Sequence, residues 1–414
     1  MRARTAVVCS VADQGVAALT NILVLVTAAR LSTAAGFARF SAVYLVFTVL
    51  LGVSGAHTGQ PLALRRGEGG DVGGACRSAV AFTLLAAAAL GIPLAAVCLP
   101  LPGAAARALA VLGLVLPAVL GQDALRYAFA TLHLPHLALA GDALRLVCAL
   151  GALAAQPHGV PAARLVLVWG LSALPALALS AALLHRRTAG APTRPRDLLR
   201  RGHLGRRFVV EFGVGNATSQ LSVLGLGAVG TPLAVGALRG STTLFGPLNV
   251  LFSSATGFGP PLLGRLPSAR HRVRASAALA AVLAATAALW AAVLAVLPDG
   301  IGRHLLGDTW PTAAALLPAT GSQYAAMAVG TCGLLALRVL DPRTTLPVQV
   351  VFSCAAVAFL ACGYALGGVP GAAWGLCLGS LCKAVATWVR VVRLGRRASA
   401  PAAAVSARPV RPGP

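Results

Sequence analysis

Charged residues are scarce in this sequence. Only 11% of its 414 residues are Asp, Glu, Lys or Arg, whereas 57% are hydrophobic. Soluble domains carry about 25% charged residues, so the composition excludes an ordinary soluble protein. Aromatic residues are also few, at 5%. We therefore predict a polytopic membrane protein.

The sequence also lacks the motifs of common catalytic and metal sites. It has no Walker motif, no glycine-rich phosphate loop beside a strand, no HExxH and no nucleophile elbow. Its nine cysteines form no CxxC or Cys/His cluster, so we expect neither a metal site nor a disulfide framework. We expect a protein that is not an enzyme and holds no cofactor, with H⁺ or Na⁺ left open as a coupling ion.

Long apolar runs fill most of the chain. A membrane-spanning helix needs about 20 apolar residues, and the runs predict an all-α protein with about twelve transmembrane helices. We place the spans at 5–29, 39–64, 78–100, 107–131, 135–155, 163–185, 208–229, 235–263, 275–298, 311–337, 345–366 and 370–392.

Acidic residues are scarcer than basic ones. Ten Asp and Glu stand against 34 Lys and Arg, which gives a formal net charge of +24. Assigned to alternate sides of the predicted spans, 25 basic residues share the side of the N-terminus and five lie on the other. This is a positive-inside asymmetry, so we expect both termini in the cytoplasm. The charge then serves topology and anionic membrane lipids, and we expect no nucleic-acid partner.

The longest polar stretch, 186–207, divides the predicted spans six and six. Residues 36–65 and 236–265 share nine identities in 30 positions without a gap, which indicates an internal repeat. Six spans return the chain to its starting side, so the two repeats are parallel. We predict an N-terminal six-helix lobe (1–185), a basic cytoplasmic linker (186–207), a C-terminal six-helix lobe (208–392) and a disordered basic cytoplasmic tail (393–414).

Polar residues interrupt the first predicted span. On a helical wheel Asp13, Gln14, Thr20 and Asn21 share one face, and apolar residues such as Ile22 lie opposite. An ionised carboxylate at membrane depth costs about 2.5–3.5 kcal/mol on insertion scales. We therefore expect this face to border a protein interior or a water-filled cavity.

The seventh span repeats this pattern half a chain later. Glu211 stands 198 residues after Asp13, and Thr218 and Ser222 share its helix face. Each lobe thus begins with a helix that carries a carboxylate and a polar stripe. The carboxylate could bind cargo or change protonation during transport; alternatively, it is structural and pairs with an arginine between helices.

Two further spans carry an acid and an arginine three residues apart. These pairs are Asp123 with Arg126 and Asp142 with Arg145, a spacing that places opposite charges on one helix face. They are either local ion pairs or, because arginine binds phosphate through a bidentate fork, two cargo contacts.

Two more arginines occupy matching positions in the repeats. Arg39 and Arg239 lie near the outer ends of the second and eighth spans. They are further candidates for cargo phosphate, and the alternative is snorkelling to the membrane interface.

Glycines recur at four-residue spacing in the last span. Gly371, Gly375 and Gly379 form a smooth face of small residues. Such faces let membrane helices pack closely, so we predict a helix–helix contact there.

The opening of the chain resembles a known family. The segment DQGVAALTNILVLVTAARLSTAAGFARFSAVYLVF, followed by GQPLALR, is similar to the start of Wzx-like polysaccharide transporters. These belong to the multidrug/oligosaccharidyl-lipid/polysaccharide (MOP) superfamily, which also contains the multidrug-and-toxin extruders (MATE) and the lipid II flippase. The matching elements are Asp13-Gln14, Thr20-Asn21, Ala29-Arg30, Gly36-Phe37 and Pro61-Leu62.

The resemblance implies a MATE-like fold of two lobes around a central cavity, with Asp13 at a motif position. It also implies flipping of a polyprenyl-pyrophosphate-linked oligosaccharide across the plasma membrane by alternating access, for cell-surface polysaccharide biosynthesis. The expected partners are a lipid-linked glycan, membrane lipids, and a polysaccharide polymerase or glycosyltransferases, and the expected state is a monomer.

Two alternatives stay open. The chain could be an ion-coupled, MATE-like exporter of a small cationic molecule, in which case acids dominate the cavity and the arginines are paired. It could also be a non-transporting membrane scaffold of a polysaccharide synthesis complex, in which case the space between the lobes is filled.

Overall fold

The computed structural model describes residues 3–65, 70–216, 238, 240–306 and 310–397. Within these residues the regular structure is helical and no strand is found. The predicted tail beyond 397 and the candidates Thr218, Ser222 and Arg239 lie outside the described residues.

The first lobe contains eight labelled helices. They are α1 (Ala3–Leu31), α2 (Ala34–Ser54), α3 (Gln60–Ala63), α4 (Gly70–Cys98), α5 (Ala104–Thr131), α6 (Pro135–Ala154), α7 (Ala162–Leu171) and α8 (Leu174–Arg187). A π-helical turn at Gly55–Gly59 joins α2 to α3. Gly55 and Gly59 face the ring of Tyr127, and this close approach leaves no room for a side chain at Gly59.

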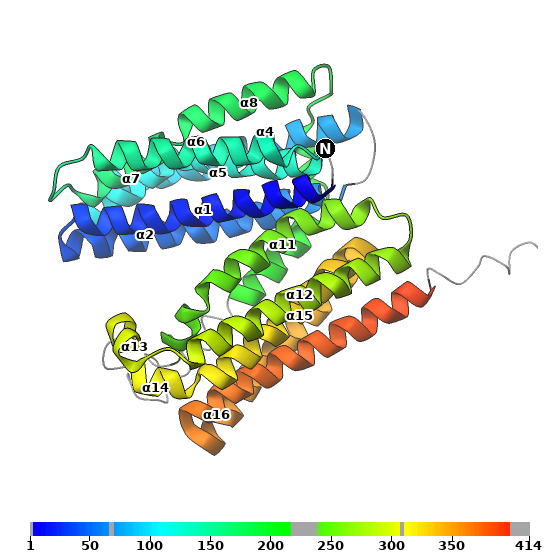
Figure 1. Ribbon diagram of the computed structural model, residues 1–414. Coiled ribbons are helices and arrows are strands. Elements are labelled where there is room, and N and C mark those ends of the chain that lie inside the picture. Colours follow the sequence, from blue (N-terminus) through cyan, green and yellow to red (C-terminus); the bar gives the residue numbers. More distant parts are fainter. Residues whose placement is uncertain (1–2, 66–69, 217–237, 239, 307–309, 398–414) are drawn as a thin grey trace, which may run out of the picture.

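The second lobe begins with a helical stretch at 205–216. Its labelled helices are α11 (Gly246–Gly264), α12 (Ala269–Ala295), α13 (Asp299–Leu306), α14 (Trp310–Ala315), α15 (Leu317–Leu340) and α16 (Thr345–Arg397). Figure 1 shows the two lobes as two adjacent bundles, with α1 of the first beside α11 of the second.

Nine helices of the described residues are long and apolar enough to cross a membrane. The last of them, Pro342–Arg396, has 55 residues and reverses direction at Gly367 and Gly368, so it makes two passes. Gly368 has φ of 59°, a left-handed conformation that glycine adopts without strain. Together with 205–216 and α11, these helices agree with the prediction of about twelve spans.

The reversal in α16 depends on the predicted glycine face. A Cβ on Gly371 would collide with the backbone of Gly363, and one on Gly375 with the carbonyl of Phe359. Gly379 lies equally close to Ala356. The two halves of α16 therefore pack at a distance that only small residues permit, and the predicted contact is confirmed.

Aromatic side chains fill the centre of each lobe. In the first, the rings of Phe47 and Trp169 meet edge to face with centroids 4.7 Å apart, and Tyr44 lies 5.3 Å from Trp169. In the second, Phe245 stacks on Tyr324 at 4.8 Å. These contacts fix the helices whose polar faces form the site.

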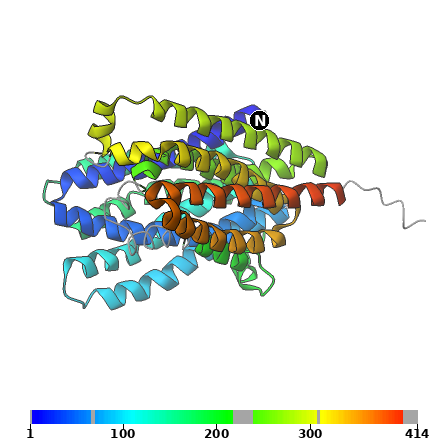
Figure 2. The same ribbon diagram turned by 90° about the horizontal axis from the view of Figure 1, so that it is seen from below.

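The basic segments gather at one end of the molecule. The described beginning and end of the chain, Ala3 and Arg397, lie at that end in both views (Figures 1 and 2). Two helices extend further towards it than the apolar pattern predicted, since α4 begins at Gly70 and α12 at Ala269. Arg77 lies in α4, and Arg270, Arg272 and Arg274 lie in α12, so part of the predicted loop charge lies on helix.

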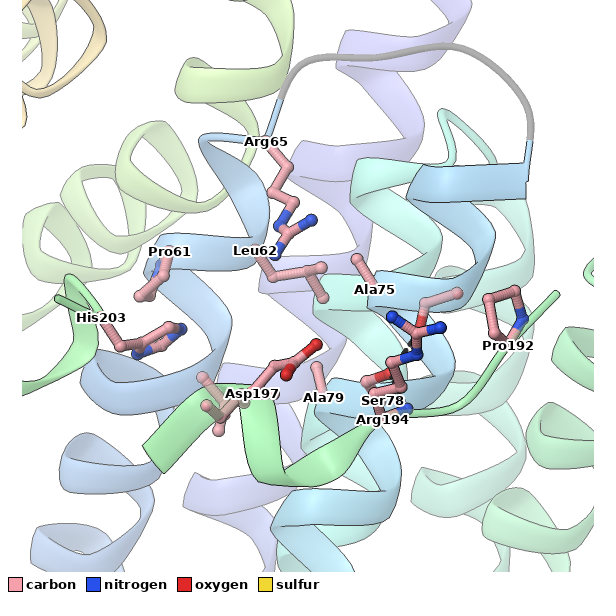
Figure 3. A pocket seen from close by; sticks show the side chains of 13 residues that line it. Pro61, Leu62, Arg65, Ala75, Ser78, Ala79, Pro192, Arg194, Asp197 and His203 are labelled. Atoms are coloured by element: carbon pink, nitrogen blue, oxygen red, sulfur yellow. Dashed lines mark hydrogen bonds between the residues drawn. The ribbon is translucent and has the colours of Figure 1, made fainter. Parts of the chain in front are cut away.

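The segment 186–207 docks on the first lobe at this basic end. Arg77 donates hydrogen bonds to the carbonyls of Thr188 and Ala191, and the Arg194 amide donates to Ser78 Oγ at 2.8 Å. Asp197 and His203 face α3 and α4 across a cavity of about 190 Å³ (Figure 3). The linker is thus packed in place rather than extended into solvent.

Candidate functional site

The polar face of α1 lies as the helical wheel predicts. Asp13 and Thr20 are 5% and 4% exposed, whereas Leu19 and Ile22 on the opposite side are 45% and 57% exposed. Asn21 accepts a hydrogen bond of 2.8 Å from the Tyr44 hydroxyl. The apolar side of α1 therefore faces lipid, and its polar side faces the protein.

Arg126 of α5 is surrounded by three carboxylates. Its guanidinium nitrogens lie 2.7 Å from Asp123 Oδ1, 2.9 Å from Asp142 Oδ2 and 3.5 Å from Asp13 Oδ2. The three acids come from α1, α5 and α6. This cluster joins two candidate pairs that the sequence treated separately.

A glutamine that the sequence reasoning missed completes the cluster. Gln122 donates to Asp142 Oδ1 and accepts from Arg145 Nη1, both at 2.5 Å. The Arg145 guanidinium also lies 5.9 Å from the centre of the Trp169 ring. Gln122 stands one helical turn before Arg126 in the sequence, and this spacing is the sequence feature that could have identified it as part of the cluster. With three carboxylates and two guanidiniums, the cluster has a formal charge of −1.

Asp13 is the most weakly held of the three acids. Its Oδ2 has only long contacts, 3.5 Å to Arg126 and 3.5 Å to Gln14. Its Oδ1 is buried without a hydrogen-bond partner among the described residues. A buried polar atom without a partner is uncommon, so this oxygen has capacity for a proton or a cation.

Asp13 borders a cavity of about 460 Å³ between the lobes. The first lobe contributes Gln14, Asn21 and Arg126, and the second contributes Phe212 and the α11 segment Asn249–Gly257. The polar face of α1 thus forms one wall of an interlobe cavity.

Both carboxylate oxygens of Glu211, in the second lobe, have partners. One carboxylate oxygen binds Arg338 of α15 and the other accepts a hydrogen bond of 2.9 Å from Thr345. The Arg338 guanidinium also stacks 5.3 Å from the Phe208 ring centre. In each lobe, the carboxylate of the first membrane span therefore contacts an arginine of the fourth span. Of these two acids, Asp13 and Glu211, it is Asp13 that has a carboxylate oxygen without a hydrogen-bond partner.

Lys383, which is the only lysine of the chain, lies in a second cavity. This cavity of about 610 Å³ is inside the second lobe. The Lys383 ammonium donates to Gln349 Oε1 at 2.5 Å, and Gln349 in turn donates to Ser353. Asn249 borders both this cavity and the interlobe cavity, so the two are neighbours.

The largest cavity, about 1380 Å³, opens between the lobes at the basic end. We call it the basic vestibule; both lobes form it, and no carboxylate is found among the described residues that line it. Burial and the nearby Arg265 lower the pKa of its histidine, His133. The cations of the vestibule are Arg65, Arg187, Arg265 and Arg338. Sequence reasoning assigned these arginines to topology because a loop position does not reveal a shared cavity.

Two of the arginine candidates, Arg126 and Arg145, border an internal pocket of about 40 Å³, and Arg126 also borders the interlobe cavity, where acids hold it. Arg145 bonds to Gln122, and its predicted partner Asp142 lies 2.9 Å from Arg126 instead. Arg39 is exposed on α2. This arrangement favours ion pairing at Arg126 and snorkelling at Arg39 over phosphate contacts.

Comparisons with known proteins give the fold a name. No protein-family model and no curated protein matches the chain. An outward-facing multidrug resistance MATE family transporter of the MOP superfamily matches with a TM-score of 0.72 and 12% identity, over 94% of this chain and 95% of that one. A mutant of the Vibrio cholerae MATE transporter VcmN matches with a TM-score of 0.70 and 15% identity, over 95% and 96%.

A third similar structure is a MOP superfamily transporter from Pyrococcus furiosus, described as having a binding pocket of reversed polarity that suggests a different function. It matches with a TM-score of 0.62 and 14% identity, over 94% of this chain and 95% of that one. The chain therefore has a MATE-like two-lobe fold, while identities of this size leave cargo open.

Proposed function

We propose that this multi-pass membrane protein is a transporter that flips an amphiphilic anion, a polyprenyl-pyrophosphate-linked oligosaccharide, by alternating access of its two lobes. The observation that carries the proposal is the basic vestibule. It collects four arginines from both lobes and has no acid among its described lining residues. Arginine suits pyrophosphate because its planar fork donates two parallel hydrogen bonds to phosphate oxygens.

Size and charge support the same cargo. Small-molecule pockets have volumes of about 300–1,000 Å³, and the vestibule exceeds this range at about 1380 Å³. A cavity lined by charge of one sign also raises the local concentration of an oppositely charged ligand. A sugar-bearing pyrophosphate fits a large cationic space of this kind at the cytoplasmic end.

In this proposal the coupling site is the acidic cluster, which consists of Asp13, Asp123, Asp142, Arg126, Arg145 and Gln122. One carboxylate oxygen of Asp13 is buried without a hydrogen-bond partner among the described residues, and Asp13 borders the interlobe cavity. Uptake of a proton or Na⁺ there would replace its long contact with Arg126, which Asp123 and Asp142 continue to hold. One ion could thus be exchanged without leaving Arg126 unpaired.

The test is a flipping assay with purified protein in vesicles, using a fluorescent prenyl-pyrophosphate glycan. Folded protein should move the label between leaflets, and a prenyl-linked neutral glycan should move much more slowly. Absence of movement by protein that elutes as a single folded species would overturn the proposal.

A second candidate is an H⁺- or Na⁺-coupled exporter of a small organic cation. The formal charge of −1 on the acidic cluster beside the interlobe cavity favours it. It predicts ion-driven accumulation of a fluorescent organic cation in vesicles and no movement of the glycan lipid. The scaffold alternative expected a filled interlobe space, and cavities of about 1380 and 460 Å³ argue against it.

A further inference from the structure

The cavity of the second lobe has a cationic side chain whose charge is not matched by an acid. Lys383 borders it, and no carboxylate occurs among its described lining residues. Glu211, on the first helix of the same lobe, is already bound by Arg338 and Thr345. The contact of the ammonium is the neutral carbonyl oxygen of Gln349. An ionisable side chain at membrane depth is a functional-site candidate by default, and no carboxylate among the described residues forms a salt bridge with Lys383.

The other polar groups of the cavity are suited to an oxyanion. The Lys383 ammonium has three N–H bonds, of which Gln349 accepts one. Asn249 uses one amide hydrogen in a long contact of 3.4 Å with the Tyr324 hydroxyl, and Gln323 of α15 also lines the cavity. A compact cation surrounded by neutral amide donors is an arrangement that binds phosphate or carboxylate.

The cavity is also reachable and of suitable size. Its volume of about 610 Å³ is within the range of about 300–1,000 Å³ for small-molecule sites. Asn249 borders it on one side and the interlobe cavity on the other. The two cavities therefore meet at Asn249.

We propose that the second-lobe cavity is an oxyanion-binding site with Lys383 as its charged contact, and that the oxyanion is the pyrophosphate of the cargo after it leaves the basic vestibule. The identification of the anion as cargo rests on the proposed function; the site itself does not. In this proposal the acidic cluster of the first lobe binds the coupling ion, and the Lys383 cavity of the second lobe binds the anion.

The test uses the single lysine as a reporter. Full-length protein in nanodiscs is acylated with an amine-specific reagent, and the rate of modification at residue 383 is measured by peptide mass mapping. The probes are farnesyl pyrophosphate, octanoate and octylammonium. We expect farnesyl pyrophosphate to slow acylation about tenfold or more by covering the amine, and octylammonium to leave the rate unchanged.

Binding to variants supplies the second measurement. Farnesyl pyrophosphate should bind Lys383→Gln about tenfold or more weakly than wild type, since hydrogen bonds to charged groups are among the strong ones. Lys383→Arg, which keeps the charge, should retain most of the affinity. The matched control is Arg393→Gln, an exposed position on the same helix, and it should bind as wild type does.

The outcomes separate the claims. The site is overturned if neither farnesyl pyrophosphate nor octanoate protects Lys383 from acylation, or if Lys383→Gln binds farnesyl pyrophosphate as tightly as wild type does. Protection by octanoate alone overturns the pyrophosphate assignment. Protection by farnesyl pyrophosphate without glycan flipping overturns the proposed function and leaves the oxyanion site standing.

Discussion

One arginine, Arg126, contacts three carboxylates at different distances. Asp123 and Asp142 lie within 3 Å of the Arg126 guanidinium, whereas Asp13 is at 3.5 Å. The two close acids balance the charge of the buried guanidinium, so we expect Asp13 to be the acid whose charge can change at least cost. This asymmetry is the reason for proposing Asp13, rather than its two neighbours, as the coupling group.

Asp13→Asn and Asp13→Ala should both fold and both lose coupling. Because Asp123 and Asp142 still hold Arg126, the free energy of unfolding should change by less than about 1.5 kcal/mol. The measurement is transport rate across a pH series and a Na⁺ series in vesicles. A variant that keeps the wild-type ion dependence would show that Asp13 only lines the interlobe cavity and does not couple transport to an ion.

For Glu211 we expect the opposite effect on stability, because among the described residues Glu211 is the acid that pairs with Arg338. Removing one partner of a buried ion pair typically costs about 3–5 kcal/mol, since an uncompensated charge remains. Glu211→Gln should therefore strongly lower thermal stability in detergent, and the double variant Glu211→Gln, Arg338→Gln should recover much of the loss. Equal stability of wild type and the single variant would contradict this pairing.

At the scale of elements, the hairpin within α16 follows directly from its glycines. Their four-residue spacing was visible in the sequence, and the structure places them against Gly363, Phe359 and Ala356. The predicted spans 345–366 and 370–392 also placed the reversal near Gly367. What the sequence left open is which helix the glycine face packs against, and the structure shows that it is the other half of α16.

Gly375→Leu should destabilise this hairpin, because its side chain would collide with the Phe359 backbone. Overpacking costs about 1–3 kcal/mol or more, so we expect a lower unfolding temperature. Gly367→Ala is the control, since the space around Gly367 is open and its φ is −145°. The explanation fails if both variants melt alike.

The docked linker is the second element with a specific consequence. Burial lowers the pKa of His203, and the neighbouring His57, Arg65 and Arg206 act in the same direction. The rings of His203 and His57 lie 5.4 Å apart. The docked linker thus prefers a neutral His203.

Linker docking should therefore be complete above the ordinary histidine pKa of about 6.5 and weaken as the pH falls below it, because protonation favours the undocked form. Hydrogen exchange of residues 195–205, corrected for intrinsic rates, should increase between pH 7 and 5.5. His203→Gln should flatten this dependence, and His185→Gln, at an exposed position, should not. Unchanged exchange in wild type would refute the docking argument.

At the scale of the whole molecule, the sequence predicted most of the helices but only part of the site. Apolar run length locates spans such as α5 and α6 within a few residues, and the wheel of α1 orients Asp13 correctly. Local spacing paired Arg126 with Asp123 but could not supply Asp142 or Asp13, which come from other helices. Lys383 and the vestibule arginines were visible as residues. The vestibule, however, exists only where the two lobes meet, and the Lys383 cavity only where helices of the second lobe pack together.

The account therefore depends on a cavity that both lobes create. Arg65 and Arg187 come from the first lobe or its boundary with the linker, and Arg265 and Arg338 come from the second. Neutralising Arg338 would also break its ion pair with Glu211, so the variant changes Arg65, Arg187 and Arg265.

The most direct measurement is the initial flipping rate of a fluorescent prenyl-pyrophosphate glycan by the triple variant Arg65→Gln, Arg187→Gln, Arg265→Gln. The matched control neutralises three arginines at the same end that do not line the vestibule, Arg196, Arg201 and Arg274. We predict a loss of about tenfold or more in the first variant, because three charge-assisted phosphate contacts are removed, and a near wild-type rate in the control. Equal rates in wild type and both triple variants would contradict the vestibule as the cargo site.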